Sequence, residues 1–163
     1  MKRIVVFGNS GSGKSTYAKE KSASLGCSHM DLDMVAWEPG IEPPRRRSLD
    51  ASKLEILKFI DSEQNWVVEG CYSDLLEIAI VYATEVVFLN PGTETCIENA
   101  RNRPWEPHKY NSPEAQDANL EMLIDWIKAY DRRTDEFSYV THRCLFERFE
   151  GPKREFNSNE RNP

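Results

Sequence analysis

A segment of nine residues near the N-terminus combines glycines, hydroxyl side chains and one lysine at spacings that could hold phosphate groups. It consists of Gly8, Asn9, Ser10, Gly11, Ser12, Gly13, Lys14, Ser15 and Thr16. The segment fits the pattern G-x-x-x-x-G-K-[ST], whose glycines let main-chain N–H groups approach phosphate oxygens. The lysine of this pattern neutralises the β- and γ-phosphates of a nucleoside triphosphate, and the next hydroxyl binds magnesium. We therefore expect the whole segment to bind ATP, with Lys14 catalytic and Ser15 a ligand of Mg²⁺.

The flanking residues favour this interpretation over a chance glycine-rich turn. Residues 4–7 form an apolar, β-branched run typical of a buried strand, and residues 15–25 contain good helix formers without proline. A strand-to-helix turn suits the pattern because the positive end of the helix dipole then faces the ligand. The sequence thus predicts a phosphate-binding loop between the first strand and the first helix.

Two carboxylates, Asp31 and Asp33, end the predicted second strand at residues 28–33. Open parallel sheets bind ligands at the carboxyl ends of their strands. Residues two apart on an extended segment face the same way, so both carboxylates are expected to point into one site. The alternative is a pair of solvated carboxylates at the entry to a loop.

Basic and aromatic residues lie on two loops that could contact ligands. Arg45, Arg46 and Arg47 follow prolines, and their guanidinium groups could bind a carboxylate or a phosphate of a substrate. A solvated run of charge is the alternative. Trp37 could stack on a planar or sugar ring, or it could belong to the core. Trp105 could cover an adenine in the same way.

The rest of the chain alternates strands with helices. Further strands are expected at residues 66–68 and 85–89, with a fifth at residues 153–157, and the apolar runs indicate a parallel sheet covered on both faces. Helices are expected over residues 48–62, 73–80, 93–101, 113–132 and 138–149. In the first of these helices the inward residues are predicted to be Leu54, Leu57, Phe59 and Ile60. The fold class is therefore α/β, with three layers and a mostly parallel sheet of about five strands.

Composition limits the class of protein and its partners. The 163 residues fit one domain with an ample core. The net charge of −6 argues against sequence-independent nucleic-acid binding, which needs a basic face. No apolar run approaches the ~20 residues of a membrane span and no signal peptide is evident, so we expect a cytoplasmic protein with no membrane partner. The four cysteines lack C-x-x-C spacing and the three histidines lack metal-ligand spacing, so free thiols are expected.

Taken together, residues 1–110 resemble the small P-loop kinase superfamily, which includes adenylate and shikimate kinases. They look most like its adenylate-kinase-like topology modulation proteins. The resemblance rests on the phosphate-binding loop, Asp31-x-Asp33, Trp37-x-Pro39-Gly40, Glu69-Gly70 after the third strand, and an arginine-bearing segment before Pro104. It implies a P-loop NTPase fold with a substrate-binding insertion at about residues 34–64, which holds the three arginines, and a short lid at about residues 102–113.

The resemblance also implies roles for the strand-end carboxylates. In shikimate-type kinases such a pair serves magnesium and the acceptor hydroxyl, which assigns the metal to Asp31 and the acceptor to Asp33. Glu69 stands where related kinases carry aspartate before glycine. Its longer side chain suits a water-mediated or substrate contact, so Glu69 and Gly70 are predicted to bind substrate; a strand-end charge at a tight turn is the alternative.

Two arginines of this region look like the lid arginines of such kinases. A lid arginine neutralises negative charge on the transferring phosphoryl group, which makes Arg103 a catalytic candidate and Arg101 a nucleotide-binding one. The alternative is a pair of charges complementing a helix dipole. Lys109 is a further cation of the lid.

The sequence therefore predicts a phosphotransferase that uses ATP and Mg²⁺ on a small hydroxyl- or phosphate-bearing metabolite, such as a nucleoside, a nucleotide, shikimate or gluconate. An NTPase that hydrolyses ATP as a switch and a non-catalytic nucleotide-binding regulator stay open. A GTPase is disfavoured, because Asn90-Pro91-Gly92-Thr93 stands where a guanine-reading Asn-Lys-x-Asp motif would follow the fourth strand. The acceptor, and the choice between monomer and homodimer, are left open.

Overall fold

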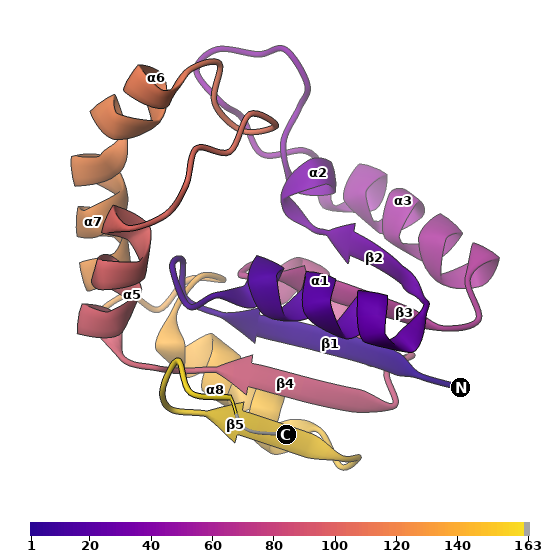
Figure 1. Ribbon diagram of the computed structural model, residues 1–163. Helices are drawn as coiled ribbons and strands as arrows, with labels where there is room; N and C mark the ends of the chain where they lie inside the picture. Colours follow the sequence, from indigo (N-terminus) through magenta and orange to yellow (C-terminus); the bar gives the residue numbers. More distant parts are fainter. Residues whose placement is uncertain (162–163) are drawn as a thin grey trace.

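Five parallel strands form the centre of the fold, which a computed structural model describes for residues 1–161 (Figure 1). In chain order the strands are β1 (Arg3–Gly8), β2 (Ser28–Asp31), β3 (Trp66–Gly70), β4 (Glu85–Leu89) and β5 (Lys153–Phe156). Their order across the sheet is β2-β3-β1-β4-β5, and every neighbouring pair is parallel. The fifth strand predicted at residues 153–157 is confirmed, and it pairs with β4.

Eight helices within residues 1–161 connect and cover these strands. They are α1 (Lys14–Leu25), α2 (Asp33–Ala36), α3 (Leu49–Ser62), α4 (Ser73–Ile80), α5 (Thr93–Arg101), α6 (Pro113–Ala118), α7 (Leu120–Lys128) and α8 (Tyr139–Arg148). Three of them begin after a serine whose hydroxyl accepts a backbone N–H of the first turn, namely Ser48, Ser112 and Ser138. In this part of the chain, every helix is too short or too polar to cross a membrane.

The two faces of β1 pack against different helices. Val5 and Phe7 lie in one core with buried residues of α3, α4 and α8, whereas Ile4 and Val6 pack against α1. This alternation follows from the two-residue period of a strand, and both faces are apolar because both are covered. Figure 1 shows α1 and α8 on opposite sides of the sheet. The predicted three-layer α/β fold is confirmed.

Helices α5 and α7 form a separate apolar cluster beside the sheet. Its buried residues are Cys96, Ile97, Ala100, Ile124 and Ile127. This helix pair lies at the carboxyl ends of the strands, and the segment that leaves α5 passes over those ends (Figure 1). The four cysteines are free thiols, as expected.

The single helix predicted over residues 113–132 is wrong. The structure has α6 and α7 instead, separated at Asn119. The Asn119 side chain donates to the Tyr110 hydroxyl at 2.9 Å, and its backbone N–H bonds Gln116 O, three residues back. Beyond α7 the chain turns, because Tyr130 is buried and its hydroxyl bonds His142 Nδ1 at 2.8 Å. Periodicity alone does not reveal the break at Asn119, because Tyr110 lies outside the predicted helix.

Two further details differ from the sequence-based expectation. Leu54 of α3 is exposed rather than inward, because the buried stripe of that helix runs through Ser52, Ile56 and Ile60. Ser52 is buried because its hydroxyl donates to Val35 O at 2.8 Å. The predicted extended segment at residues 28–33 is too long, since β2 ends at Asp31 and α2 begins at Asp33.

Candidate active site

The phosphate-binding loop connects β1 to α1, as predicted. Gly11 and Gly13 have φ angles of 76° and 84°, which L side chains rarely adopt. A Cβ atom on Gly11 would lie 2.3 Å from Cys96 O, so α5 closes directly on the loop. Asn99 of α5 adds a hydrogen bond from its Nδ2 to Gly11 O at 2.8 Å. The loop is therefore held in shape by the α5 helix as well as by its own glycines.

Lys14 occupies the first turn of α1 and reaches back across the loop. Its Nζ donates to Asn9 O at 2.8 Å. The Asn9 side chain is buried and donates to Ile127 O at 3.2 Å, which ties the loop to the end of α7. The positive end of the α1 dipole and the Lys14 ammonium group thus face the same space, the arrangement that binds phosphate.

A cavity of about 1160 Å³ opens over the loop and the carboxyl ends of β2 and β3. Its walls come from the phosphate-binding loop, from Asp33 and Trp37, from residues 69–72 and from residues 102–110. Ligand pockets usually measure roughly 300–1,000 Å³, so this cavity has room for two small ligands. Ligands of open α/β sheets bind at this edge.

Asp33 is fixed in the cavity wall by two partners. Lys109 Nζ lies 2.9 Å from Asp33 Oδ2, and the Tyr72 hydroxyl donates to Asp33 Oδ1 at 2.6 Å. Burial alone would raise the pKa of Asp33, but the Lys109 charge and the two hydrogen bonds outweigh it and lower the pKa. Asp33 is therefore an ionised hydrogen-bond acceptor at neutral pH.

Asp31 lies behind Asp33 and has a different electrostatic environment. Its Oδ1 accepts the Asp33 backbone N–H at 2.9 Å, and its Oδ2 lies 4.0 Å from Lys109 Nζ. Burial, followed by the charges of Glu69 and Asp33, raises the pKa of Asp31 to about 6. The two carboxylates lie close together at the turn between β2 and α2, where Lys109 contacts both, but only Asp33 belongs to the described lining of the cavity.

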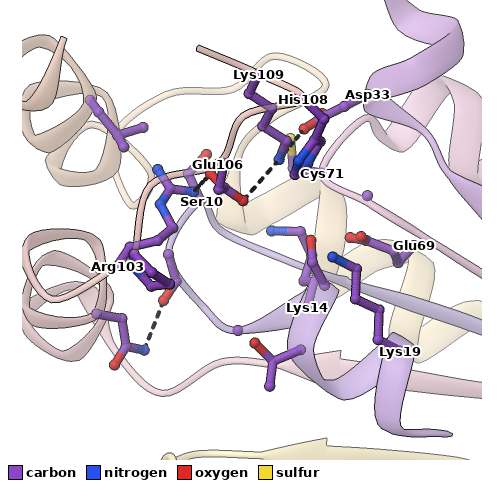
Figure 2. Close-up of a pocket in the computed structure, with 18 of the residues that line it drawn as sticks. Ser10, Lys14, Lys19, Asp33, Glu69, Cys71, Arg103, Glu106, His108 and Lys109 are labelled. Carbon is purple, nitrogen blue, oxygen red and sulfur yellow. Dashed lines mark hydrogen bonds and ion pairs between the residues drawn. The ribbon is translucent and has the colours of Figure 1, made fainter. Parts of the chain in front are cut away.

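The segment of residues 102–110 covers the cavity and is bonded to itself. Arg103 Nη1 pairs with Glu106 Oε2 at 3.1 Å, and Lys109 Nζ lies 3.8 Å from Glu106 Oε1. Trp105 Nε1 donates to Tyr110 O at 3.0 Å. Figure 2 shows Lys109 and Asp33 side by side above Lys14, with Arg103 on the opposite wall. This segment therefore carries cations over both the phosphate-binding loop and Asp33.

Comparisons with known proteins agree with this architecture. No protein-family model matches the chain. A Pyrococcus furiosus protein named "Putative adenylate kinase" is 28% identical over 109 residues, which span 65% of this chain but only 58% of that protein.

Solved structures are similar over nearly the whole chain. Shikimate kinase from Acinetobacter baumannii has a TM-score of 0.54 at 15% identity and is covered over 86% of its chain, with 98% of this chain matched. A gluconokinase from Sinorhizobium meliloti 1021 has a TM-score of 0.53 at 18% identity, matching 98% of this chain and 84% of its own. Deoxyadenosine kinase from M. mycoides has a TM-score of 0.51 at 16% identity, matching 99% and 93%. The chain has a P-loop kinase-like fold. At such low identities the likeness concerns the fold alone.

Within this P-loop kinase-like fold, the two arginines predicted to belong to a lid, Arg101 and Arg103, lie in different places. Arg103 lines the main cavity. Arg101 is exposed on the last turn of α5 and lines a separate small pocket with Leu120 and Gln116. Of the two, the structure thus brings only Arg103 to the cavity over the phosphate-binding loop.

Two of the three consecutive arginines, Arg45 and Arg46, form ion pairs away from the cavity. Arg45 Nε donates to Glu38 Oε2 at 3.1 Å. Arg46 Nη2 pairs with Asp74 Oδ2 at 2.9 Å, and its Nη1 pairs with Glu136 Oε1 at 3.1 Å. The lining of the cavity, as far as residues 1–161 form it, includes none of the three. Trp37, by contrast, lines it and donates its Nε1–H to the Tyr72 hydroxyl at 2.8 Å.

Glu69 and Gly70 both line the cavity at the end of β3. Glu69 is almost fully buried, and its Oε1 has no hydrogen-bond partner among the described residues; His29 Nε2 is 3.6 Å away. A buried carboxylate oxygen without a partner is costly, so a ligand or water is expected to bond it. Gly70 is required by packing, because a Cβ atom there would lie 2.9 Å from Leu32 Cβ.

Sequence reasoning missed the part played by the C-terminal segment. Polar, asparagine-rich residues such as those after β5 usually make few ordered contacts. Instead, Arg161 Nη2 donates to Ser12 O at 2.9 Å and its Nη1 to Gly13 O at 3.2 Å, so its guanidinium group lies on the phosphate-binding loop. Asn159 bonds Asn99 at 2.9 Å. Nothing in the local composition marks an arginine for this contact, which depends on where β5 ends.

Proposed function

We propose that the protein is an ATP- and Mg²⁺-dependent phosphotransferase that acts on a hydroxyl group of a small molecule. One observation carries the proposal: Lys14 of the phosphate-binding loop and the ionised Asp33 line the same cavity, beneath the cations of residues 102–110. The P-loop kinase-like fold supports it. Residues 102–113 serve as the lid, and the region of about residues 34–64 contributes the acceptor side through Trp37.

The phosphate side of the reaction uses the loop and the start of α1. Backbone N–H groups of the loop and the Lys14 ammonium group hold the β- and γ-phosphates and offset their charge. To do so, Lys14 gives up its hydrogen bond to Asn9 O. This exchange costs little free energy, because the new phosphate partner is anionic and bonds the ammonium group more strongly. Ser10, Ser12 and Thr16 belong to the same nucleotide-binding segment.

The acceptor side uses Asp33. As a carboxylate it accepts the hydrogen bond of the acceptor hydroxyl and either orients this group or takes its proton as the O–P bond forms. Tyr72 fixes the carboxylate through its hydroxyl, so the oxygen is positioned before the acceptor arrives. Arg103 and Lys109 place positive charge above the transferring phosphoryl group, where negative charge is spread in the transition state.

The residues present fit a magnesium ion. Mg²⁺ keeps several waters and takes one or two carboxylates together with substrate phosphates. Ser15 and Asp31 would hold it, directly or through water, and it would supply positive charge that offsets the charge of the phosphates. The crowded charges of Glu69 and Asp33, which raise the pKa of Asp31, and the unpartnered Glu69 Oε1 favour a cation here. Among residues 1–161 no group of three or more His, Cys, Asp or Glu could hold a metal alone, so the nucleotide would have to complete the site.

ADP release from the purified full chain tests the proposal against its alternatives. ATP and Mg²⁺ are supplied with panels of hydroxyl compounds, and each rate is compared with a blank without acceptor. Acceptor-dependent release supports a kinase, equal release in the blank supports an NTPase, and ATP binding without release supports a regulator. Lys14→Ala is the background control, because its side chain points to the ligand rather than into a core.

A further inference from the structure

Four aromatic side chains form one continuous wall of the cavity, which we call the aromatic wall. Trp37 contacts Tyr72, Tyr72 contacts Phe137, and Phe137 contacts Trp126, with ring centroids 6.4, 5.2 and 5.1 Å apart and nearly perpendicular planes. All four line the cavity. Trp37 and Trp126 are 37% and 38% exposed, so each offers apolar ring surface to the cavity rather than to a core. Exposed tryptophan on a concave surface marks a place where a ring is bound.

Two arginines, Arg46 and Arg133, pack against the rings of the aromatic wall and hold them in place. Arg46 lies 4.9 Å from the centroid of Tyr72 and 5.5 Å from that of Phe137, and Arg133 lies 3.6 Å from that of Trp126. Both arginines are neutralised: Arg46 by Asp74 and Glu136, and Arg133 by Asp135 at 2.7 Å. Neither belongs to the described lining of the cavity. Their guanidinium groups therefore hold the rings in place, and their positive charge is balanced by carboxylates and is not available to a ligand.

The remaining charges on this side disfavour an anionic acceptor. Asp33 and Glu69 line the cavity beside the aromatic wall, and Glu106 faces them from the lid. Among the lining cations, Lys109 pairs with Asp33, and Arg103 pairs through its Nη1 with Glu106. Lys14 and Lys19 also line the cavity, but they extend from α1, the helix that follows the phosphate-binding loop. Recognition of a carboxylate or phosphate normally uses an arginine fork with free N–H groups. An anionic acceptor would instead approach carboxylates, and such like-charge contacts reject a ligand.

We propose, on the basis of the phosphotransferase function above, that the acceptor is an uncharged hydroxyl compound with a ring that stacks on the aromatic wall. The ring lies against Trp37 and Trp126 while its hydroxyl bonds Asp33. Nucleosides and free sugars share this chemistry, whereas nucleotides and sugar acids carry the charge that the site disfavours. The γ-phosphoryl group passes from ATP to the acceptor oxygen, the proton of that hydroxyl leaves through Asp33 or water, and ADP is released.

Calorimetry with matched pairs of compounds tests this inference on the full chain, with Mg²⁺ and a non-hydrolysable ATP analogue present. Adenosine is compared with AMP, and glucose with glucuronate, so each pair keeps its ring and differs in charge, and the two pairs separate nucleosides from sugars. We expect the neutral member of at least one pair to bind tenfold or more tightly than its anionic partner. Tighter binding of the anionic members, or no binding by either pair, overturns the inference.

Variants of the aromatic wall supply the second measurement. Trp126→Leu is expected to raise the Kd of the bound neutral compound about tenfold, the scale of one stacking contact, and to leave the Kd of the ATP analogue within about twofold. Trp126→Phe keeps a ring and should restore most of the affinity. Tyr82→Leu is the matched control, because Tyr82 is 42% exposed and outside the described cavity lining. Unchanged affinity in Trp126→Leu contradicts the role of the aromatic wall.

The same panel distinguishes failure of the inference from failure of the proposed function. Turnover of AMP or glucuronate with no binding of the neutral partners keeps the kinase and removes the neutral acceptor. Tight binding of adenosine or glucose without ADP release above the blank keeps the binding inference and removes the kinase.

Discussion

Lys109 Nζ lies 2.9 Å from Asp33 Oδ2 and 4.0 Å from Asp31 Oδ2. Lys109 thus contacts the carboxylates at the end of β2, more than seventy residues away in the chain. The pairing stabilises both charges: it lowers the pKa of Asp33 and, against the effect of burial, raises that of Lys109. The same ion pair joins residues 102–110 to the end of β2 and keeps the proposed acceptor-binding carboxylate ionised.

Removing this cation should shift the pH dependence of the reaction. Burial would then act on Asp33 without compensation from Lys109, so its pKa rises in Lys109→Met. Asp33 can accept the hydrogen bond of the acceptor only while it is ionised, so activity is lost below its pKa. We therefore expect the acidic limb of the pH profile of kcat/KM to move to higher pH in Lys109→Met. Lys109→Arg preserves the charge and should leave the limb near its original place. The pH profile of acceptor-dependent ADP release measures this, and identical limbs in wild type and Lys109→Met contradict it.

Asp31 should make magnesium use depend on pH. Its pKa is raised to about 6, and a proton competes with the metal for the carboxylate below that pH. The Mg²⁺ concentration for half-maximal activity should therefore increase as the pH falls below about 6 and stay level above it. Asp31→Asn should raise the Mg²⁺ requirement at neutral pH and remove this dependence.

Asp33→Asn is the companion variant for the same titrations. It should lower kcat through loss of the acceptor contact, with little change in the magnesium requirement. If activity depends on the Mg²⁺ concentration in the same way in Asp31→Asn and Asp33→Asn, the separate roles of the two residues are contradicted.

Arg101 and Arg103 provide a matched pair of variants. Arg103 lines the cavity, so Arg103→Ala should lower kcat strongly, by a factor of about 10³ if it stabilises the transition state as arginine fingers do. ATP binding should weaken much less, since this charge is needed mostly in the transition state. Arg101→Ala should change kcat less than threefold, because Arg101 is exposed and lines a different pocket. Steady-state kinetics and calorimetry measure kcat and ATP binding in both variants. Comparable losses of kcat in Arg103→Ala and Arg101→Ala would show that both arginines act as charges at the end of α5 instead.

The features that the sequence predicted are those with local causes. The phosphate-binding loop and the positions of the first four strands follow from residue types close together in the chain, whereas the strand at residues 153–157 is expected because a P-loop domain of this size usually has a fifth strand. The acceptor side does not, because Trp126, Phe137 and Lys109 reach Asp33 from distant segments. The arginines at 45–47 show the same limit: Asp74 and Glu136, which neutralise Arg46, cannot be identified from its neighbours. Asn119 broke a helix that periodicity alone extended, since its side chain bonds Tyr110.

His142 should make the stability of the fold depend on pH. It is fully buried, and burial lowers its pKa to about 4. Its Nε2–H donates to Cys71 O at 2.8 Å, so Nδ1 accepts the Tyr130 hydroxyl and the ring is neutral. The unfolded chain protonates this ring at about pH 6.5, so the unfolded state binds more protons between pH 6.5 and 4, and stability falls as the pH falls. From these values the loss of stability between pH 7 and pH 5 is about 2 kcal/mol.

The raised pKa of Asp31 changes stability in the opposite sense over this range. Wild type must therefore be compared with His142→Gln, which lacks the imidazole titration. Urea unfolding at both pH values measures the difference, and His142→Gln should be less stable than wild type at pH 7, with the gap narrowing by about 2 kcal/mol at pH 5. A gap that is equal at the two pH values shows that His142 does not titrate between the folded and unfolded states as its burial requires.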